Sequence, residues 1–319
     1  MDRFQDGHHV RLRSRVRRTY LHAADDGVGV TIHERRASMN AAWTVQIYHG
    51  KDGPYLLLHS AAYGRYLAAT ATPARLGHRG LRAELRDYDQ PDVEAIMWLA
   101  VRSGFADNVV LLRNIGGRYL RANGRYLRWN TGVSVDDSVS SMMYWVVEPI
   151  PAREDMPALP APPPVSSPIL RAVLDLLNIT MDHGSIFVIR QQNPPYGYLL
   201  GVYLEPRRLI RFVRALDDGH YPEDPEDEGW RQFWFRGRSA FRLRDDLGFL
   251  VGAGVYYRNI AMCVRAGRYG RPTPLVVDLP DGGYGGTLEI VVLLADTPGK
   301  CEPLFMPLLP PMYLLTENQ

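Results

Sequence analysis

The sequence contains few residues of the kinds that build covalent or metal-bound sites. Its 319 residues include only two cysteines, Cys263 and Cys301, which lie far apart and without Cys-x-x-Cys spacing. This excludes a disulfide framework and a zinc knuckle. The sequence also lacks a Gly-x-Ser-x-Gly elbow, a His-Glu-x-x-His motif and a phosphate loop, and Gly252-x-Gly254 has no third glycine for a dinucleotide fingerprint. We therefore predict no enzyme, no cofactor and no metal centre.

Long hydrophobic runs are missing as well. No stretch of about 18 uninterrupted apolar residues is present, which predicts no transmembrane segment. The first six residues carry charges where a signal peptide needs an apolar run, so we expect none. Together these absences predict a cytoplasmic or nucleocytoplasmic protein.

Lysine is almost missing, and arginine supplies nearly all of the positive charge. Lys51 and Lys300 are the only lysines among 37 basic residues, and the first 150 residues carry 20 Arg or Lys against 15 Asp or Glu. Five arginines crowd into one predicted hairpin: Arg11 and Arg13 on the solvent side of a strand, and Arg15, Arg17 and Arg18 in the turn after it. Functionally this basic patch is able to meet a polyanion, whether nucleic acid, an acidic protein surface or anionic lipid, and structurally it is a solvated face. Exposed aromatics between the arginines, which single-strand binding requires, are not evident, so we do not expect nucleic acid.

The first 150 residues contain a threefold repeat. Each copy has a strand of alternating apolar residues, a polar turn, a Tyr-Leu-x-Ala segment and a closing tryptophan. The copies start at Val10, Leu56 and Val110, return at Tyr20, Tyr66 and Tyr119, and close at Trp43, Trp98 and Trp145. A period of roughly 45 to 55 residues indicates a repeat architecture.

Three such units must share one core, because none can bury its apolar face alone. With about four strands per copy, the sequence predicts a β-trefoil, in which a six-stranded barrel is closed by three hairpins. The core layers are predicted to contain the three tryptophans, the three tyrosines above, and Leu12, Leu58 and Leu112. We interpret these aromatics as core residues and not as a ligand platform.

The second half of the chain predicts a different domain. Residues 150–168 form a proline-rich spacer, and residues 169–206 are an uncertain insertion. From 207 to 297 we expect two strands at 209–213 and 230–235, a helix capped by Ser239, and strands at 260–265, 275–277 and 288–294. This α+β order predicts a ubiquitin-like β-grasp. The tail from 298 to 319 is expected to be irregular.

Two further features could be read as metal sites. The acidic loop from Asp217 to Gly229 does not match EF-hand spacing, so we interpret it as a solvated hairpin loop. His8 and His9 precede the first predicted strand, where we favour a hydrated or capping role over metal binding.

The repeat resembles the fascin-like, or actin-cross-linking, trefoil superfamily. More closely, the chain resembles a large plant family known only as a domain of unknown function, followed by a companion ubiquitin-like domain. The residues that carry this resemblance are 6–14, 56–69, 128–132 and 145–150 in the first half and 235–239 and 263–271 in the second. Residues 169–206 depart from it, since the family's linker usually passes directly to the strand near Arg211.

The resemblance implies a non-catalytic module that binds a protein partner, with actin as one candidate. Fascin-like bundlers use several trefoils, so we expect no cross-linking by this single trefoil, while binding at a single filament site stays open. A carbohydrate-binding, lectin-like trefoil is an alternative, although ricin-type trefoils carry Gln where this chain has Ala41, Ile96 and Met143. The remaining alternative is an enzyme whose residues come together only in three dimensions.

Overall fold

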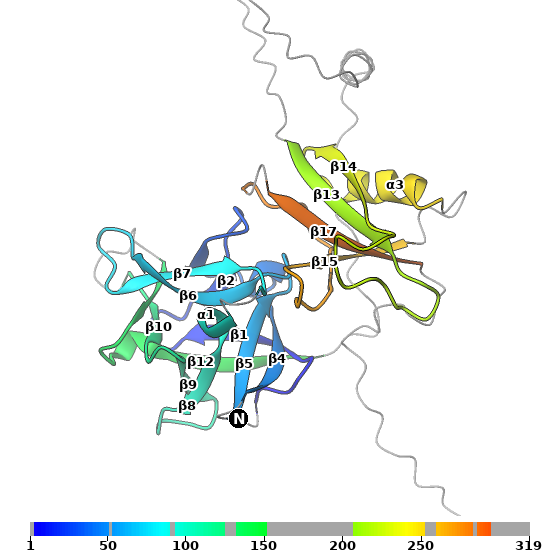
Figure 1. Ribbon diagram of the computed structural model, residues 1–319. Coiled ribbons are helices and arrows are strands. Elements are labelled where there is room, and N and C mark those ends of the chain that lie inside the picture. The colour runs from blue at the N-terminus through cyan, green and yellow to red at the C-terminus, as the bar shows by residue number, and fades with distance from the viewer. Residues whose placement is uncertain are drawn as a thin grey trace, which may run out of the picture.

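Residues 3–50, 53–89, 93–124, 132–151, 207–252, 260–282 and 286–294 are described by the computed structural model. The insertion at 169–206, the tail from 298 and all but two residues of the proline-rich spacer lie outside these ranges. The described residues form an N-terminal β-trefoil and a C-terminal ubiquitin-like domain, each with its own sheet (Figure 1). The fold is therefore mainly β, as the sequence predicted.

The trefoil contains four strands in each of its three copies. The first copy has β1 (His9–Ser14), β2 (Tyr20–Ala23), β3 (Val30–His33) and β4 (Trp43–Gly50). The second has β5 (Gly53–Ser60), β6 (Tyr66–Pro73), β7 (Leu81–Arg86) and β8 (Trp98–Arg102). The third has β9 (Val109–Asn114), β10 (Tyr119–Ala122), β11 (Val133–Asp136) and β12 (Tyr144–Ile150). A short helical turn precedes each tryptophan: η1 (Met39–Ala41), α1 (Val93–Ile96) and η2 (Ser141–Met143).

The outer strands of the copies close into a barrel. Antiparallel pairing runs from β1 to β4, β5, β8, β9 and β12 in turn, and β12 pairs with β1 again. The hairpins β2–β3, β6–β7 and β10–β11 cover one end of it. Closure leaves these barrel strands without an unpaired edge.

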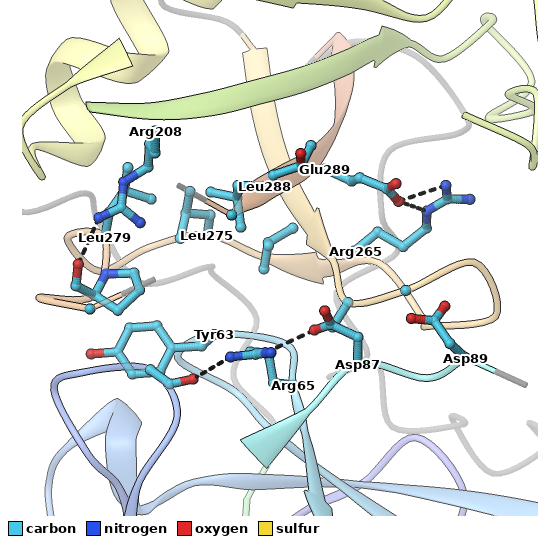
Figure 2. Close-up of a pocket in the computed structure, with 18 of the residues that line it drawn as sticks. Tyr63, Arg65, Asp87, Asp89, Arg208, Arg265, Leu275, Leu279, Leu288 and Glu289 are labelled. Carbon is cyan, nitrogen blue, oxygen red and sulfur yellow. Dashed lines mark hydrogen bonds and ion pairs between the residues drawn. The ribbon is translucent and has the colours of Figure 1, made fainter. Parts of the chain in front are cut away.

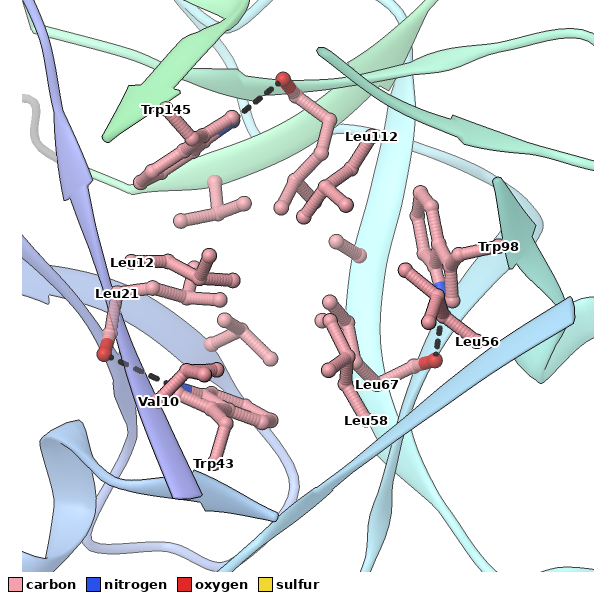
Figure 3. Packing of buried hydrophobic residues seen from close by; sticks show 14 of the residues in the cluster. Val10, Leu12, Leu21, Trp43, Leu56, Leu58, Leu67, Trp98, Leu112 and Trp145 are labelled. Atoms are coloured by element: carbon pink, nitrogen blue, oxygen red, sulfur yellow. Dashed lines mark hydrogen bonds between the residues drawn. The ribbon is translucent and has the colours of Figure 1, made fainter. Parts of the chain in front are cut away.

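The barrel core repeats the same contacts three times (Figure 3). Trp43, Trp98 and Trp145 are completely buried. Their indole N–H groups donate to the carbonyls of Leu21, Leu67 and Leu120 at 3.1, 2.8 and 3.0 Å, each within its own copy. These bonds satisfy the polar atom that each buried tryptophan carries. The prediction that the tryptophans are core residues is confirmed.

The tyrosines do not belong to this central core, contrary to the sequence prediction. Tyr20 and Tyr66 are buried elsewhere and Tyr119 is half-buried, while the leucine that follows each one enters the core cluster. The register explains the difference, because Tyr66 lies directly opposite His59, the neighbour of the inward-facing Leu58. Residues paired across two strands share one face of the sheet, so the tyrosines point outward.

The second domain is a five-stranded sheet with one helix. Its elements are β13 (Arg207–Arg214), β14 (Arg231–Arg236), α3 (Ala240–Leu250), β15 (Ile260–Arg265), β16 (Thr273–Pro274) and β17 (Thr287–Leu294). The strand order is β14-β13-β17-β15-β16, with β13 and β17 parallel. As predicted, Ser239 caps α3, because its hydroxyl accepts from the N–H of Arg242 at 3.3 Å. Leu243 and Leu247 on the helix pack into this domain's core.

The fourth strand of this domain lies earlier in the chain than the predicted range of 275–277. Pairing in β16 covers only Thr273 and Pro274, and the apolar run at 275–277 follows it without strand structure. The run is apolar because it is buried from two sides: Leu275 lies in the core of the ubiquitin-like domain, whereas Val277 packs against the trefoil core. A short apolar run indicates burial without specifying backbone conformation.

Within the described residues, no helix has the length and apolar character needed to cross a membrane.

Candidate functional site

The five arginines predicted to form a basic patch lie together at the β1–β2 hairpin. Arg11 and Arg13 belong to β1, where both are half-buried, while Arg15, Arg17 and Arg18 occupy the connection to β2. Arg18 has a φ of 57°, in the left-handed region that residues with a side chain rarely adopt. Its N–H donates to the carbonyl of Ser14 at 2.8 Å, which keeps the turn tight and the cations close together.

Two arginines share one carboxylate beside this hairpin. Arg13 Nε lies 2.7 Å from Glu148 Oε1, and Arg36 Nε lies 3.2 Å from Glu148 Oε2. Burial raises the pKa of Glu148, but the hydrogen bonds from the two guanidinium groups outweigh it, so the pKa of this carboxyl ends below its ordinary value. Because two cations share a single anion, the patch keeps an excess of positive charge.

The patch also contains an aromatic side chain that sequence reasoning missed. The guanidinium carbon of Arg15 lies 4.1 Å from the ring centroid of Phe105, which lies in the connection between β8 and β9 and is 56% exposed. Tyr144 meets the same ring edge-on at 4.9 Å. Barrel closure brings these residues together, so no local sequence signal could have revealed the contact.

A second candidate site lies where the ubiquitin-like domain meets the trefoil. The loop between β15 and β16 runs along the segment that follows β7. Tyr88 donates its N–H to the carbonyl of Ala266 at 2.8 Å, and the N–H of Arg268 reaches Asp89 Oδ1 at 3.0 Å. Gly267 has a φ of 84°, and a Cβ there would lie 2.7 Å from the backbone of Tyr88. The close approach of the two chain segments therefore requires glycine.

The same loop contacts the second trefoil hairpin. The N–H of Arg271 donates to the Tyr66 hydroxyl at 3.0 Å, and its guanidinium pairs with Asp6 at 3.0 Å. Thr273 Oγ1 lies 3.2 Å from Nδ1 of His59. Burial, with smaller contributions from His9 and Arg271, lowers the pKa of His59 to about 3, so its ring is neutral in the interface.

A further contact joins the first copy to the turn before β17. The N–H of Asp281 donates to the carbonyl of Asp25 at 2.6 Å. Gly27 has a φ of 69°, and a Cβ there would lie 2.6 Å from Pro280 Cβ. The two domains are thus joined at two separate places.

A cavity of about 520 Å³ lies between these two contacts (Figure 2). Its apolar side comes from the ubiquitin-like domain and includes Val264, Leu275, Leu279 and Leu288. Its charged lining includes Arg65, Asp87, Asp89, Arg208, Arg265 and Glu289. This volume lies within the range of small-molecule sites, roughly 300–1,000 Å³. No linear motif marked the cavity, because its walls come from both domains.

The charges around the cavity are largely paired within the protein. Arg65 Nε lies 2.8 Å from Asp87 Oδ1, and its Nη1 donates to the carbonyl of Gly27 at 3.0 Å. Arg265 binds Glu289 at 2.8 Å, and Arg208 donates to the carbonyl of Pro280 at 2.7 Å. The described lining contains neither histidine nor cysteine, the residues that most often act as base or nucleophile.

Arginines hold the acidic loop in place. Arg268 pairs with Asp224 at 2.7 Å, Arg211 pairs with Glu226 at 3.2 Å, and Arg265 donates to the carbonyl of Glu223 at 2.6 Å. No group of three or more potential metal ligands occurs among the residues the structure describes. His9 belongs to β1 instead of preceding it, and its Nε2 lies 2.9 Å from the hydroxyl of Thr44.

Comparison with known proteins identifies both halves of the chain. Residues 1–153 match the family described as the beta-trefoil domain of unknown function (DUF569). Residues 206–293 match the DUF569 associated ubiquitin-like domain. No curated protein matches the chain.

Several solved structures resemble slightly less than half of this chain. The SDF2-like protein from Arabidopsis thaliana is 16% identical, with 45% of this chain and 93% of that chain covered and a TM-score of 0.39. The ricin B-like lectin of Macrolepiota procera, solved with lactose, is 19% identical, with 45% of this chain and 96% of that chain covered and a TM-score of 0.37. At these TM-scores the likenesses carry no argument about a ligand.

Proposed function

Because this chain belongs to the family that joins the DUF569 β-trefoil to its associated ubiquitin-like domain, we propose that it is a non-catalytic module that binds an acidic protein partner through the β1–β2 hairpin. The observation that carries the proposal is the excess of positive charge on this hairpin. Arg13 and Arg36 share the single carboxylate of Glu148, and three further arginines lie in the adjoining connection. An excess of positive charge attracts an acidic surface and speeds encounter with it.

The stacked pair of Arg15 and Phe105 adds an apolar element to this basic surface. Aromatic residues and arginine are enriched among the residues that dominate binding energy at protein interfaces. Phe105 is more than half exposed beside Arg15, so a partner can cover both at once. This favours a protein surface over a simple anion.

Filamentous actin is the first partner to test, because its surface is acidic and the trefoil superfamily that this chain resembles includes actin cross-linkers. Cosedimentation of the full chain is expected to show pelleting at low salt that decreases as salt is raised, since exposed charge pairs are screened. We expect saturation without filament bundling, because a single hairpin supplies a single contact. No pelleting above background at low salt removes actin as a candidate.

A charge-reversal variant tests the wider proposal without assuming the partner. Arg15, Arg17 and Arg18 are changed to Glu, and partners from matched extracts are compared by affinity purification and mass spectrometry. The control changes Arg75, Arg79 and Arg113, three exposed arginines elsewhere on the trefoil, to Glu, which alters net charge equally. Partners should disappear only with the hairpin variant. Identical partner sets for both variants contradict the proposal.

The two alternatives have weaker support in the geometry. Ala41, Ile96 and Met143, at the positions where ricin-type trefoils carry Gln, are fully or almost fully buried and are therefore out of reach of a sugar. A glycan array with reproducible hits would nevertheless favour the lectin-like role over ours. For an enzyme, the described lining of the interdomain cavity offers no nucleophile paired with a base.

A further inference from the structure

The interdomain cavity has a flat cationic group on its trefoil side. Arg65 is held there by two hydrogen bonds, one to Asp87 and one to the carbonyl of Gly27. Both acceptors belong to the trefoil, so the guanidinium keeps its position without help from the second domain. Because such bonds lie in the guanidinium plane, its flat faces remain available for stacking on an aromatic ring.

The opposite side of the cavity, which comes from the ubiquitin-like domain, has an apolar wall beside the charged Arg208, Arg265 and Glu289. Figure 2 shows Leu275, Leu279 and Leu288 facing Arg65 across the space. Leu275 and Leu279 are buried and anchored in the core of the ubiquitin-like domain, so this wall is as firmly held as the guanidinium. A ligand between the two sides needs one flat face for the guanidinium and an apolar body for the leucines.

The pairing of charges indicates that the ligand is uncharged. Arg65 is paired with Asp87, and Arg265 with Glu289, so a charged ligand has to displace a partner that is already bound. Displacing one leaves the released charge without compensation, which is costly in a partly enclosed site. A neutral ligand leaves both pairs intact.

The rim nevertheless offers hydrogen-bond acceptors. Asp87 has 43% of its side chain exposed, and Asp89 accepts a backbone hydrogen bond from Arg268 through its Oδ1 atom. An ionised carboxylate can accept about four hydrogen bonds, so both retain acceptor capacity. Hydroxyl groups on a ligand match these acceptors.

We propose that this cavity binds a small, uncharged, planar aromatic molecule that carries hydroxyl groups. Its ring stacks on Arg65, its other face contacts Leu275 and Leu288, and its hydroxyls donate to Asp87 or Asp89. The site requires both domains, since the stacking group belongs to the trefoil and the apolar wall to the ubiquitin-like domain. The proposal is independent of the partner bound at the β1–β2 hairpin.

Binding of simple phenolic probes to the full chain tests this proposal. 7-Hydroxycoumarin and naringenin are titrated at pH 6, where both are uncharged, with saturation-transfer NMR and fluorescence as readouts. Benzoate serves as a planar anion and cyclohexanol as an uncharged, non-planar alcohol. The two phenols are expected to bind saturably, and both comparison molecules about tenfold more weakly.

Two variants locate the binding. Arg65→Lys keeps the charge and removes the flat face, and should weaken phenol binding roughly tenfold. Arg86→Lys is the matched control, because Arg86 also belongs to the trefoil, pairs with Glu84 at 3.0 Å and has a similarly exposed side chain, 37% against 30%. Leu288→Trp narrows the cavity at its apolar wall and should weaken phenol binding. Thermal unfolding midpoints establish that each variant is folded.

Several results would overturn the proposal. Absence of saturable binding by both phenols is one, and benzoate binding as tightly as they do is another. Phenol binding that is unchanged in both folded variants, Arg65→Lys and Leu288→Trp, places the probe elsewhere and has the same consequence. Loss of binding in the Arg86→Lys control would show that the effect does not depend on stacking at Arg65.

Discussion

The first and second trefoil hairpins share one sequence pattern but have different surroundings. In both, a leucine of the first strand and a leucine of the second enter the barrel core. On the outer face, Tyr20 lies opposite Arg13 and its hydroxyl donates to Glu148 at 3.5 Å, entirely within the trefoil. Tyr66 lies opposite His59, and its hydroxyl accepts from Arg271 of the ubiquitin-like domain.

One of the positions that differ between the two hairpins lies in the domain interface. Where the first and third copies carry Arg13 and Arg113, the second carries His59, which is completely buried under Thr273. A neutral ring can be buried with one hydrogen-bond partner, whereas a guanidinium needs several. The second hairpin is therefore adapted to hold the chain's own second domain, whereas the first keeps its arginines on its outer face.

The shared core is where the three copies should behave alike. Trp43→Ala, Trp98→Ala and Trp145→Ala each remove a buried indole and its hydrogen bond to a leucine carbonyl. Each is expected to lower the free energy of unfolding by about 3–5 kcal/mol. Urea denaturation measures the change. A variant that loses less than about 1 kcal/mol would contradict the equivalence of the copies.

Exchanging His59 and Arg13 between the two hairpins should destabilise the domain interface in one case and have little effect in the other. His59→Arg places a charge in the domain interface and is expected to cost roughly 3 kcal/mol of docking free energy. Two separate unfolding transitions and an increased radius of gyration in solution scattering would show undocking. The reciprocal change, Arg13→His, removes a half-exposed ion pair and should cost at most about 1 kcal/mol. Equal effects of the two substitutions would contradict the conclusion that the second hairpin is the one adapted to hold the ubiquitin-like domain.

Acidification should destabilise the folded chain through two buried histidines, His59 in the second hairpin and His9 in β1. Folding lowers the pKa of His59 from 6.5 to about 3 and that of His9 to about 4. Between pH 6.5 and these values the unfolded chain binds protons that the folded chain does not, so stability is complete above pH 6.5 and falls as the pH decreases.

The expected loss from His59 at about pH 4.5 is on the order of 3 kcal/mol. Unfolding midpoints measured from about pH 7 down to this value provide the test. His59→Gln should reduce the slope, and adding His9→Gln should reduce it further. A slope that the double variant does not change would exclude these histidines as its source.

Two glycines with similar positive φ angles allow the comparison with the smallest expected effect. Gly267 and Gly104 have φ values of 84° and 77°, but a Cβ at Gly267 meets the backbone of Tyr88 and one at Gly104 meets nothing within 4 Å. Changing each to Ala separates the interface contribution from backbone strain. Gly267→Ala should cost about 1–2 kcal/mol more than Gly104→Ala, measured by chemical denaturation. Equal losses of stability in the two variants would mean that backbone strain alone explains the effect at Gly267.

Sequence periodicity predicted most of the fold. The recurring leucines and tryptophans identified the trefoil, and the order of hairpin, helix and strands identified the ubiquitin-like domain. The same reasoning misplaced the tyrosines, because an alternating pattern shows that two faces exist without showing which one the barrel encloses. It also placed a strand at 275–277, where an apolar run is buried between two cores.

The candidate sites also contain some features that the sequence predicted and others that only the folded structure brings together. The arginines between positions 11 and 18 are close together in sequence, so their clustering could be predicted from the sequence alone. Phe105 and Glu148 joined the patch only through barrel closure. The cavity could not be predicted, because Arg65 and Leu275 are distant in sequence and meet only when the domains dock.

Local patterns of apolar and charged residues were enough to predict two folding units, most of their strands and a basic first hairpin. Tertiary structure alone decided which trefoil copy holds the ubiquitin-like domain and where a cavity forms between them. The physical reason is that docking depends on close approach at Gly27 and Gly267 and on a buried neutral His59. These contacts join residues separated by more than 170 positions, and no local pattern encodes such a distance.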